Sequence, residues 1–153
     1  MDAAASQRKN TAGYTATSGG RKQRRRISWK EFQRRYLDKE NGYKYEWVNG
    51  MVEKTRSTMN PNQLYIQFNL QDFFMRLLSE GKVTGQLLGE PDLLLFEEHH
   101  RRPDMAWLTR EQVERLREEG AIEVPCFIVE VISNKEAAVK VAEKMEDYRM
   151  AGV

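Results

Sequence analysis

Residues 126–133 read CFIVEVIS, an apolar run that contains one carboxylate, Glu130. The density of β-branched and aromatic side chains predicts a buried β-strand over residues 126–132. Removing an unpaired carboxylate from water costs on the order of several kcal/mol, so a cation, a base, a proton or a water-filled cleft must neutralise Glu130. We expect burial and nearby negative charge to raise its pKa. A strand-edge glutamate paired with a lysine or an arginine is the structural alternative.

The composition predicts one globular domain. Of the 153 residues, 40% are hydrophobic and 31% are charged, and a chain of this length can bury a core. The sequence has no apolar run of about 18 residues and no apolar N-terminal segment, so we expect neither a membrane span nor a secretory signal. Cys126 is the single cysteine. We expect it to be a small core residue in a reducing compartment, which predicts a cytoplasmic protein.

Basic charge is concentrated in residues 1–26. This segment carries seven basic residues and one acid, whereas the whole chain has a net charge of +2, so residues 27–153 are acidic overall. Its small and polar composition predicts a disordered tail that precedes a domain at 27–153. The candidate contacts to nucleic-acid phosphates are Arg21, Lys22, Arg24, Arg25 and Arg26. A solubilising or cloning-derived tail explains the same composition.

Hydrophobic periodicity and turn residues divide the domain into a series of elements. Ser28 predicts the start of a helix that closes at residues 41–42, and Asn49-Gly50 predicts a hairpin turn. The adjacent histidines at 99–100 have no spaced ligand partner and are expected in a polar loop. The remaining elements are expected as helices at 62–80, 110–119 and 135–150, and as strands at 83–88, 92–96, 104–108 and 126–132. This order predicts a mixed α/β (α+β) fold with a mostly antiparallel sheet flanked by helices.

Three further charged residues stand near positions that packing residues should occupy. Asp104 begins the strand before that of Glu130, and aspartate is common at strand starts. However, two neighbouring carboxylates repel each other unless a cation such as Mg²⁺ or Mn²⁺ lies between them. Lys144 lies at the helical spacing of the apolar residues of the last helix, so it lies on or next to the buried face. The alternative is a lysine whose stem packs while its ammonium reaches water. Glu46 lies on the hairpin, where a solvated face is the alternative. Together, these residues are typical of metal-assisted phosphodiester hydrolysis.

Four segments resemble, in their order and spacing, the Uma-two endonuclease family. They are YKYEWVNGMVEKT (43–55), RRPDMAWLT (101–109), FIVEVIS (127–133) and EKMEDYRMAGV (143–153). This family is a bacterial branch of the PD-(D/E)XK superfamily, so the resemblance implies a restriction-endonuclease-like fold over about residues 27–153. Family members continue after the AGV motif with a strand that this sequence lacks. We therefore expect a C-terminally truncated domain whose sheet edge is exposed or covered by a partner, which leaves a homodimer open.

The resemblance also implies an activity, a cofactor and a partner. The protein would be an endonuclease that hydrolyses DNA with water activated by Mg²⁺ or Mn²⁺. Asp104 and Glu130 would be the metal ligands, Lys144 the catalytic lysine, and Glu46 an additional acid that faces the site. The common superfamily pattern places the lysine two residues after the glutamate, where this chain has Ile132. A catalytically inactive relative that binds nucleic acid, or a decaying fragment, is the alternative.

Overall fold

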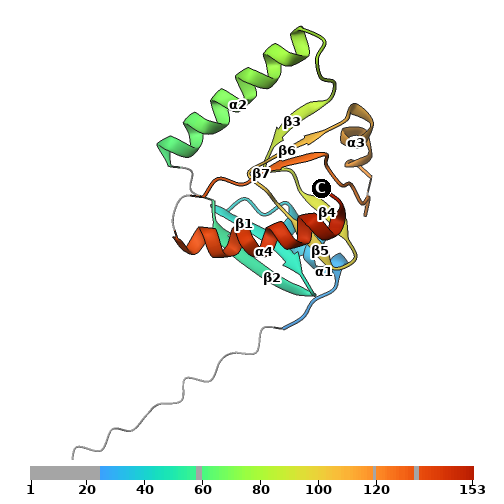
Figure 1. The fold of residues 1–153 in the computed structure, drawn as a ribbon. Helices are drawn as coiled ribbons and strands as arrows, with labels where there is room; N and C mark the ends of the chain where they lie inside the picture. Colours follow the sequence, from blue (N-terminus) through green and yellow to red (C-terminus); the bar gives the residue numbers. More distant parts are fainter. Residues whose placement is uncertain (1–24, 58–59, 119, 133–134) are drawn as a thin grey trace, which may run out of the picture.

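The computed structural model describes residues 25–57, 60–118, 120–132 and 135–153 (Figure 1). Except for Arg25 and Arg26, the predicted tail lies outside the described residues. Within them, the strands divide into two antiparallel sheets, and helices lie beside these sheets. This arrangement agrees with the mixed α/β, restriction-endonuclease-like architecture that the sequence predicts.

Aromatic packing holds the first helical segment against the sheet. Helix α1 (Trp29–Phe32) continues as the π-helical segment η1 (Gln33–Leu37). The hydroxyl of Ser28 accepts the N–H of Glu31 at 3.2 Å, which caps the helix at the predicted residue. The buried members of the aromatic cluster are Phe32, Tyr45 and Trp47. These side chains fix one face of the following hairpin against α1.

Strands β1 (Tyr43–Val48) and β2 (Met51–Arg56) form the predicted hairpin. Asn49 and Gly50 have φ angles of 49° and 74°, as a type I′ turn requires at both central residues. Because side chains alternate along a strand, the face opposite the aromatic cluster carries Glu46. The hairpin therefore presents this carboxylate to the interior of the protein.

The first sheet has the strand order β2-β1-β5-β4. It contains β4 (Leu93–Phe96) and β5 (His99–Arg101), which are joined by a turn in which Glu98 has a φ of 61°. The predicted polar loop at the histidines is therefore wrong. His100 is buried because β5 pairs with both β1 and β4. Its Nε2 lies 3.1 Å from Asp92 Oδ1.

The second sheet has the order β3-β6-β7. Its strands are β3 (Gln86–Gly89), β6 (Met105–Leu108) and β7 (Phe127–Val129), and helix α3 (Arg110–Arg115) follows β6. The predicted last strand extends beyond β7 at both ends. Cys126, expected in the core, is exposed at the start of β7.

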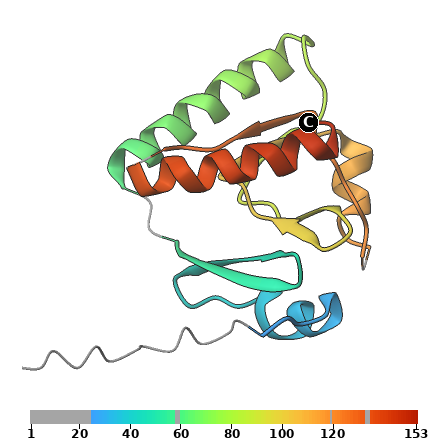
Figure 2. The ribbon, with the colours of Figure 1, turned by 60° about the horizontal axis from the view of Figure 1, so that its bottom comes forward.

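Helix α2 (Pro61–Ser79) begins with a capping box between Asn60 and Gln63. The predicted helix at 62–80 is therefore confirmed. It contacts β7 through the rings of Phe74 and Phe127, whose centroids are 6.2 Å apart. The outward face is also apolar: its exposed large side chains are Leu64, Tyr65, Ile66, Phe68, Phe73 and Met75. Figures 1 and 2 show the helix lying away from the β1–β2 hairpin.

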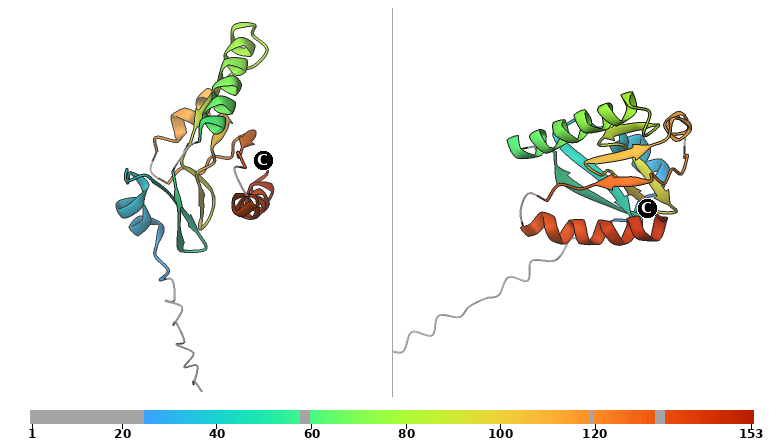
Figure 3. Two further views of the ribbon diagram at one scale, coloured as in Figure 1. Left: turned by 90° about the vertical axis from the view of Figure 1, so that its left-hand side faces the viewer. Right: turned by 45° about the horizontal axis from the view of Figure 1, so that its top comes forward.

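Helix α4 (Lys135–Ala151) contacts β4 and contributes to the main core. The buried core residues are Leu93, Leu95, Ala106, Leu108 and Tyr148. The left view of Figure 3 shows α4 and α1 on opposite sides of the strands. In the last two turns of α4, Lys144, Asp147 and Tyr148 contact charged side chains that come from strands β1 and β5 and from the residue after β7.

Candidate active site

The register of the second sheet brings Asp104 and Glu130 together. Strands β6 and β7 are antiparallel, and Met105 pairs with Val129. Asp104 and Glu130 are the next residues outward, so they lie opposite each other where the ladder ends. The backbone N–H of Val131 donates to Asp104 Oδ2 at 2.8 Å. The backbone therefore places the two predicted metal ligands side by side.

Helix α4 supplies two donors to Glu130. Its Oε1 accepts the Tyr148 hydroxyl at 2.6 Å and the Lys144 ammonium at 3.0 Å, because residues four apart share one helical face. Burial raises the pKa of Glu130 against the opposing effect of Lys144 and Tyr148, and the charge of Asp104 also raises it. The expected direction is confirmed. The structural alternative, a glutamate paired with a lysine, is also present, because Lys144 binds Glu130.

Glu46 is a central acid of the site and is only 5% exposed. It accepts Lys144 Nζ at 2.9 Å, Arg101 Nη1 at 3.2 Å and the backbone N–H of Arg102 at 2.8 Å. Burial opposes ionisation of this carboxyl, but the charges of Lys144 and Arg101 outweigh it and lower the pKa of Glu46. The solvated-face alternative for Glu46 is therefore wrong.

Lys144 connects the acids of the two sheets. Its ammonium binds Glu46 from β1 and Glu130 after β7, and its side chain is only 14% exposed. Burial lowers the pKa of Lys144, but the two carboxylates outweigh burial and raise it. The alternative of an ammonium that reaches water is therefore wrong, and Lys144 remains charged between two acids.

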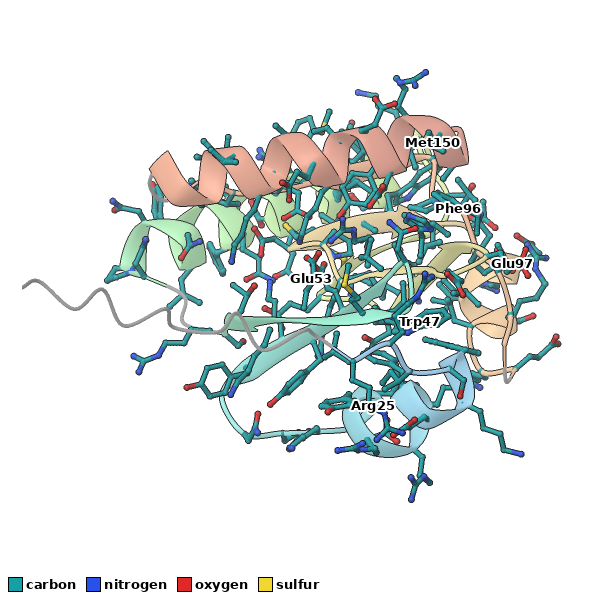
Figure 4. All side chains as sticks on the ribbon, turned by 90° about the horizontal axis from the view of Figure 1, so that it is seen from below. Arg25, Trp47, Glu53, Phe96, Glu97 and Met150 are labelled. Atoms are coloured by element: carbon teal, nitrogen blue, oxygen red, sulfur yellow. The ribbon has the colours of Figure 1, made fainter. Side chains whose placement is uncertain are left out.

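A buried arginine, which the sequence interpretation missed, extends the cluster. Arg101 donates through Nε to Asp147 Oδ2 at 2.7 Å and through Nη1 to Glu53 Oε2 at 3.1 Å, in addition to its bond to Glu46. Figure 4 shows Glu53 between the hairpin and α4. The sequence HHRRPD reads as a polar loop, so the burial of Arg101 becomes visible only when β5 pairs with its neighbours.

A second lysine, Lys44, also binds the predicted metal ligand Asp104. Its Nζ lies 2.6 Å from Asp104 Oδ1 and 2.9 Å from Glu90 Oε1. Glu90 has a φ of 48°, and its N–H donates to the carbonyl of Asp104 at 3.0 Å. The alternation of side chains along β1 puts Lys44 on the same face as Glu46, but no signal in the sequence connects Glu90 with either residue.

Acidic side chains outnumber basic ones in this cluster. Within the described residues, the acids of this cluster are Glu46, Glu53, Glu90, Asp104, Glu130 and Asp147, and the cations that bind them are Lys44, Arg101, Arg102 and Lys144. The cluster therefore carries excess negative charge. In the same part of the chain, no three His, Cys, Asp or Glu side chains are arranged to hold a metal. Two carboxylates completed by water and phosphate oxygens are the ligand set that Mg²⁺ commonly uses.

The described bases of the predicted nucleic-acid contact are Arg25 and Arg26. Arg26 Nη2 binds Glu98 Oε2 at 2.9 Å in an exposed ion pair. This contact places Arg26 against the turn between β4 and β5. The other three bases predicted to contact phosphates, Arg21, Lys22 and Arg24, lie outside the described residues.

The sequence matches a known protein family over most of its length. Residues 29–153 match the model of the Uma2 family, described as "Putative restriction endonuclease". The chain therefore belongs to the Uma2 family, the one that its motifs resemble. No curated protein matches the sequence. Among residues 25–57, 60–118, 120–132 and 135–153, no helix has the length and apolar character needed to cross a membrane.

Proposed function

We propose that this protein is a Mg²⁺- or Mn²⁺-dependent endonuclease that hydrolyses phosphodiester bonds in DNA in the cytoplasm. The observation that carries the proposal is the position of Asp104 and Glu130 at the end of the β6–β7 ladder, with the Lys144 ammonium against Glu130. Membership of the Uma2 family supports the nuclease class. The basic residues 21–26 would add contacts to DNA phosphates.

The contacts of each residue support a role in this reaction. Asp104 and Glu130 would hold the ion, which when bound would polarise the scissile phosphate and ease deprotonation of the attacking water. Lys144 would stabilise negative charge that develops on the phosphate oxygens. Glu46 holds Lys144 in place through their ion pair at 2.9 Å. The Tyr148 hydroxyl fixes the orientation of Glu130.

One observation favours a second candidate function. Lys44, Lys144 and Arg101 already bind carboxylates of this site, so the cluster is partly neutralised by the protein's own cations. A nuclease-fold relative that binds DNA without cleaving it would need no further cation. Binding in chelator without cleavage in any divalent ion is the behaviour expected of such a relative.

The test is a cleavage assay on supercoiled, linear and single-stranded DNA with Mg²⁺, Mn²⁺ or chelator. We expect cleavage only with the metal ion, and we expect its loss in Asp104→Asn and Glu130→Gln. Asp72→Asn is the matched control because Asp72 lies on α2 in an exposed pair with Arg76. Failure of the wild-type protein to cleave any of the three substrates with either ion would reject the enzyme proposal. Retained DNA binding would then favour the second candidate.

A further inference from the structure

Lys44 occupies a position beside Asp104 where a bound cation would be expected. Its ammonium lies 2.6 Å from Asp104 Oδ1 and bridges to Glu90 Oε1 at 2.9 Å. The other carboxylate oxygen of Asp104, Oδ2, accepts the N–H of Val131 at 2.8 Å. Both oxygens of this predicted metal ligand are therefore already bound by groups of the protein.

The backbone positions the three residues of this ion-pair bridge, Lys44, Asp104 and Glu90. Lys44 lies two residues before Glu46 on the same face of β1, so strand alternation directs its side chain to the site. The hydrogen bond from the Glu90 N–H to the Asp104 carbonyl holds these two acids next to each other. The Lys44 side chain is 14% exposed, whereas that of Lys82, in a surface pair with Glu80, is 65% exposed.

We propose that the Lys44 ammonium holds the place of the divalent cation at Asp104 and sets how tightly that cation binds. This inference rests on the proposed metal-dependent function. An ammonium and a divalent ion on the same carboxylate repel each other strongly at such short separation. An ion that binds Asp104 must therefore displace the ammonium, and Glu90 gives the displaced ammonium a second partner.

The consequence is a reduced affinity for metal in the wild-type protein. The apparent affinity of a site falls by the fraction of molecules in which the site is free to bind. Lys44→Met keeps the aliphatic stem and removes the charge, so every molecule then presents Asp104 without a competing ammonium. We expect this variant to bind Mn²⁺ about tenfold more tightly, or better.

The experiment is a calorimetric titration of Mn²⁺ into the full chain without nucleic acid, combined with thermal melting in chelator and in Mn²⁺. The expected result is tighter binding by Lys44→Met, a lower melting temperature in chelator, and a larger gain on adding Mn²⁺ than wild type shows. Lys54→Met is the matched control, because Lys54 lies on the same hairpin, is exposed, and stacks over the Tyr43 ring at 3.6 Å. This control should bind Mn²⁺ as wild type does.

Each contrary result has a distinct meaning. Equal affinity in wild type and Lys44→Met would overturn the inference and leave the metal-dependent nuclease standing. Absence of Mn²⁺ binding in all three proteins would overturn both. Should Lys44→Met not fold, Lys44→Gln replaces it, because its amide can donate to Asp104 and Glu90 without a charge. The same tightening must then appear in Lys44→Gln, and its absence would reject the role of Lys44.

Discussion

Replacing Glu130 with glutamine should leave the metal-free protein nearly as stable as wild type, whereas the same exchange at Glu46 should strongly destabilise it. Both carboxylates are buried in one cluster, and both bind Lys144. They differ in the number of donors and in the direction of the pKa shift. The pair of variants therefore tests which acid the fold requires and which it only tolerates.

The expected magnitude for Glu130→Gln comes from two opposing effects. The amide oxygen can still accept Tyr148 and Lys144, but it loses the charge-assisted part of these bonds, a loss of about 1 kcal/mol. The exchange also removes a carboxylate whose burial raises its pKa, which is a gain. Lys144 retains Glu46 at 2.9 Å, so no ammonium is left unpaired. The net change in the free energy of unfolding should stay within about 1 kcal/mol.

For Glu46→Gln, the loss of favourable contacts outweighs the gain from removing a buried charge. Glu46 accepts from Lys144, Arg101 and the N–H of Arg102, and its lowered pKa means that the folded state favours its ionised form. Removing this charge weakens the compensation of two buried cations at once. Lys144 keeps Glu130, and Arg101 keeps Glu53 and Asp147, so neither cation is left without an acid. The expected loss is therefore about 2–3 kcal/mol, the upper range for hydrogen bonds to charged groups.

Urea unfolding in chelator at pH 7, followed by tryptophan fluorescence, measures both values. The same proteins should be inactive in the cleavage assay if the proposed roles are correct. A loss of about 3 kcal/mol or more in Glu130→Gln would show that Glu130 is a structural partner of Lys144 and would refute the metal-site interpretation of this acid. An unchanged free energy of unfolding in Glu46→Gln would refute the conclusion that the charge of Glu46 stabilises the fold.

Three further predictions test the wider cluster and the tail. Arg101→Met should lower the free energy of unfolding by about 3–5 kcal/mol, measured in urea, because three acids lose their shared cation. Burial raises the pKa of Glu130 above its ordinary value of 4.5, so this residue favours the folded state below that pH and loses the effect as pH rises through the raised pKa. In matched pH titrations of stability, Glu130→Gln should therefore gain stability relative to wild type as pH rises. Deletion of residues 1–26 should weaken non-specific DNA binding and flatten its salt dependence in a fluorescence anisotropy titration; unchanged affinity at low salt would show that the tail makes no contact.

Local chemistry was sufficient to predict several features of the fold. The Asn49-Gly50 turn was predictable because both residues tolerate the positive φ angles that the hairpin needs. The proximity of Asp104 and Glu130 was predictable because Asp104 begins one apolar strand and Glu130 lies in the next predicted strand along the chain. The burial of Glu46 was not, because the same alternation that placed it opposite Trp47 is compatible with a solvated face.

The predictions that were wrong for His100 and Arg101 have one physical cause: a polar segment pairs as a strand only in the folded protein. The histidine and arginine residues of β5 resemble a loop in the sequence, and only strand pairing on both sides buries His100 and Arg101. The turn before β5 uses Glu98 at a positive φ, where glycine or asparagine would have given a signal. The prediction for Cys126 was wrong in the opposite direction: an apolar run predicted burial, but β7 begins only at Phe127, and Cys126 lies exposed before it.

The electrostatic contacts of the site also connect parts of the fold. Lys144 on α4 binds Glu46 on β1 and Glu130 directly after β7, and Arg101 on β5 binds acids from β1, β2 and α4. A change of charge at Glu46 therefore alters how the hairpin, β5 and α4 are held together. Asp104 and Glu130 also share the β6–β7 ladder end, so the bond between Asp104 and Lys44 couples that end to β1. Because the protein's own lysines already compensate these acids, a divalent ion should raise the melting temperature of wild type less than that of Lys44→Met, in which Asp104 lacks its lysine.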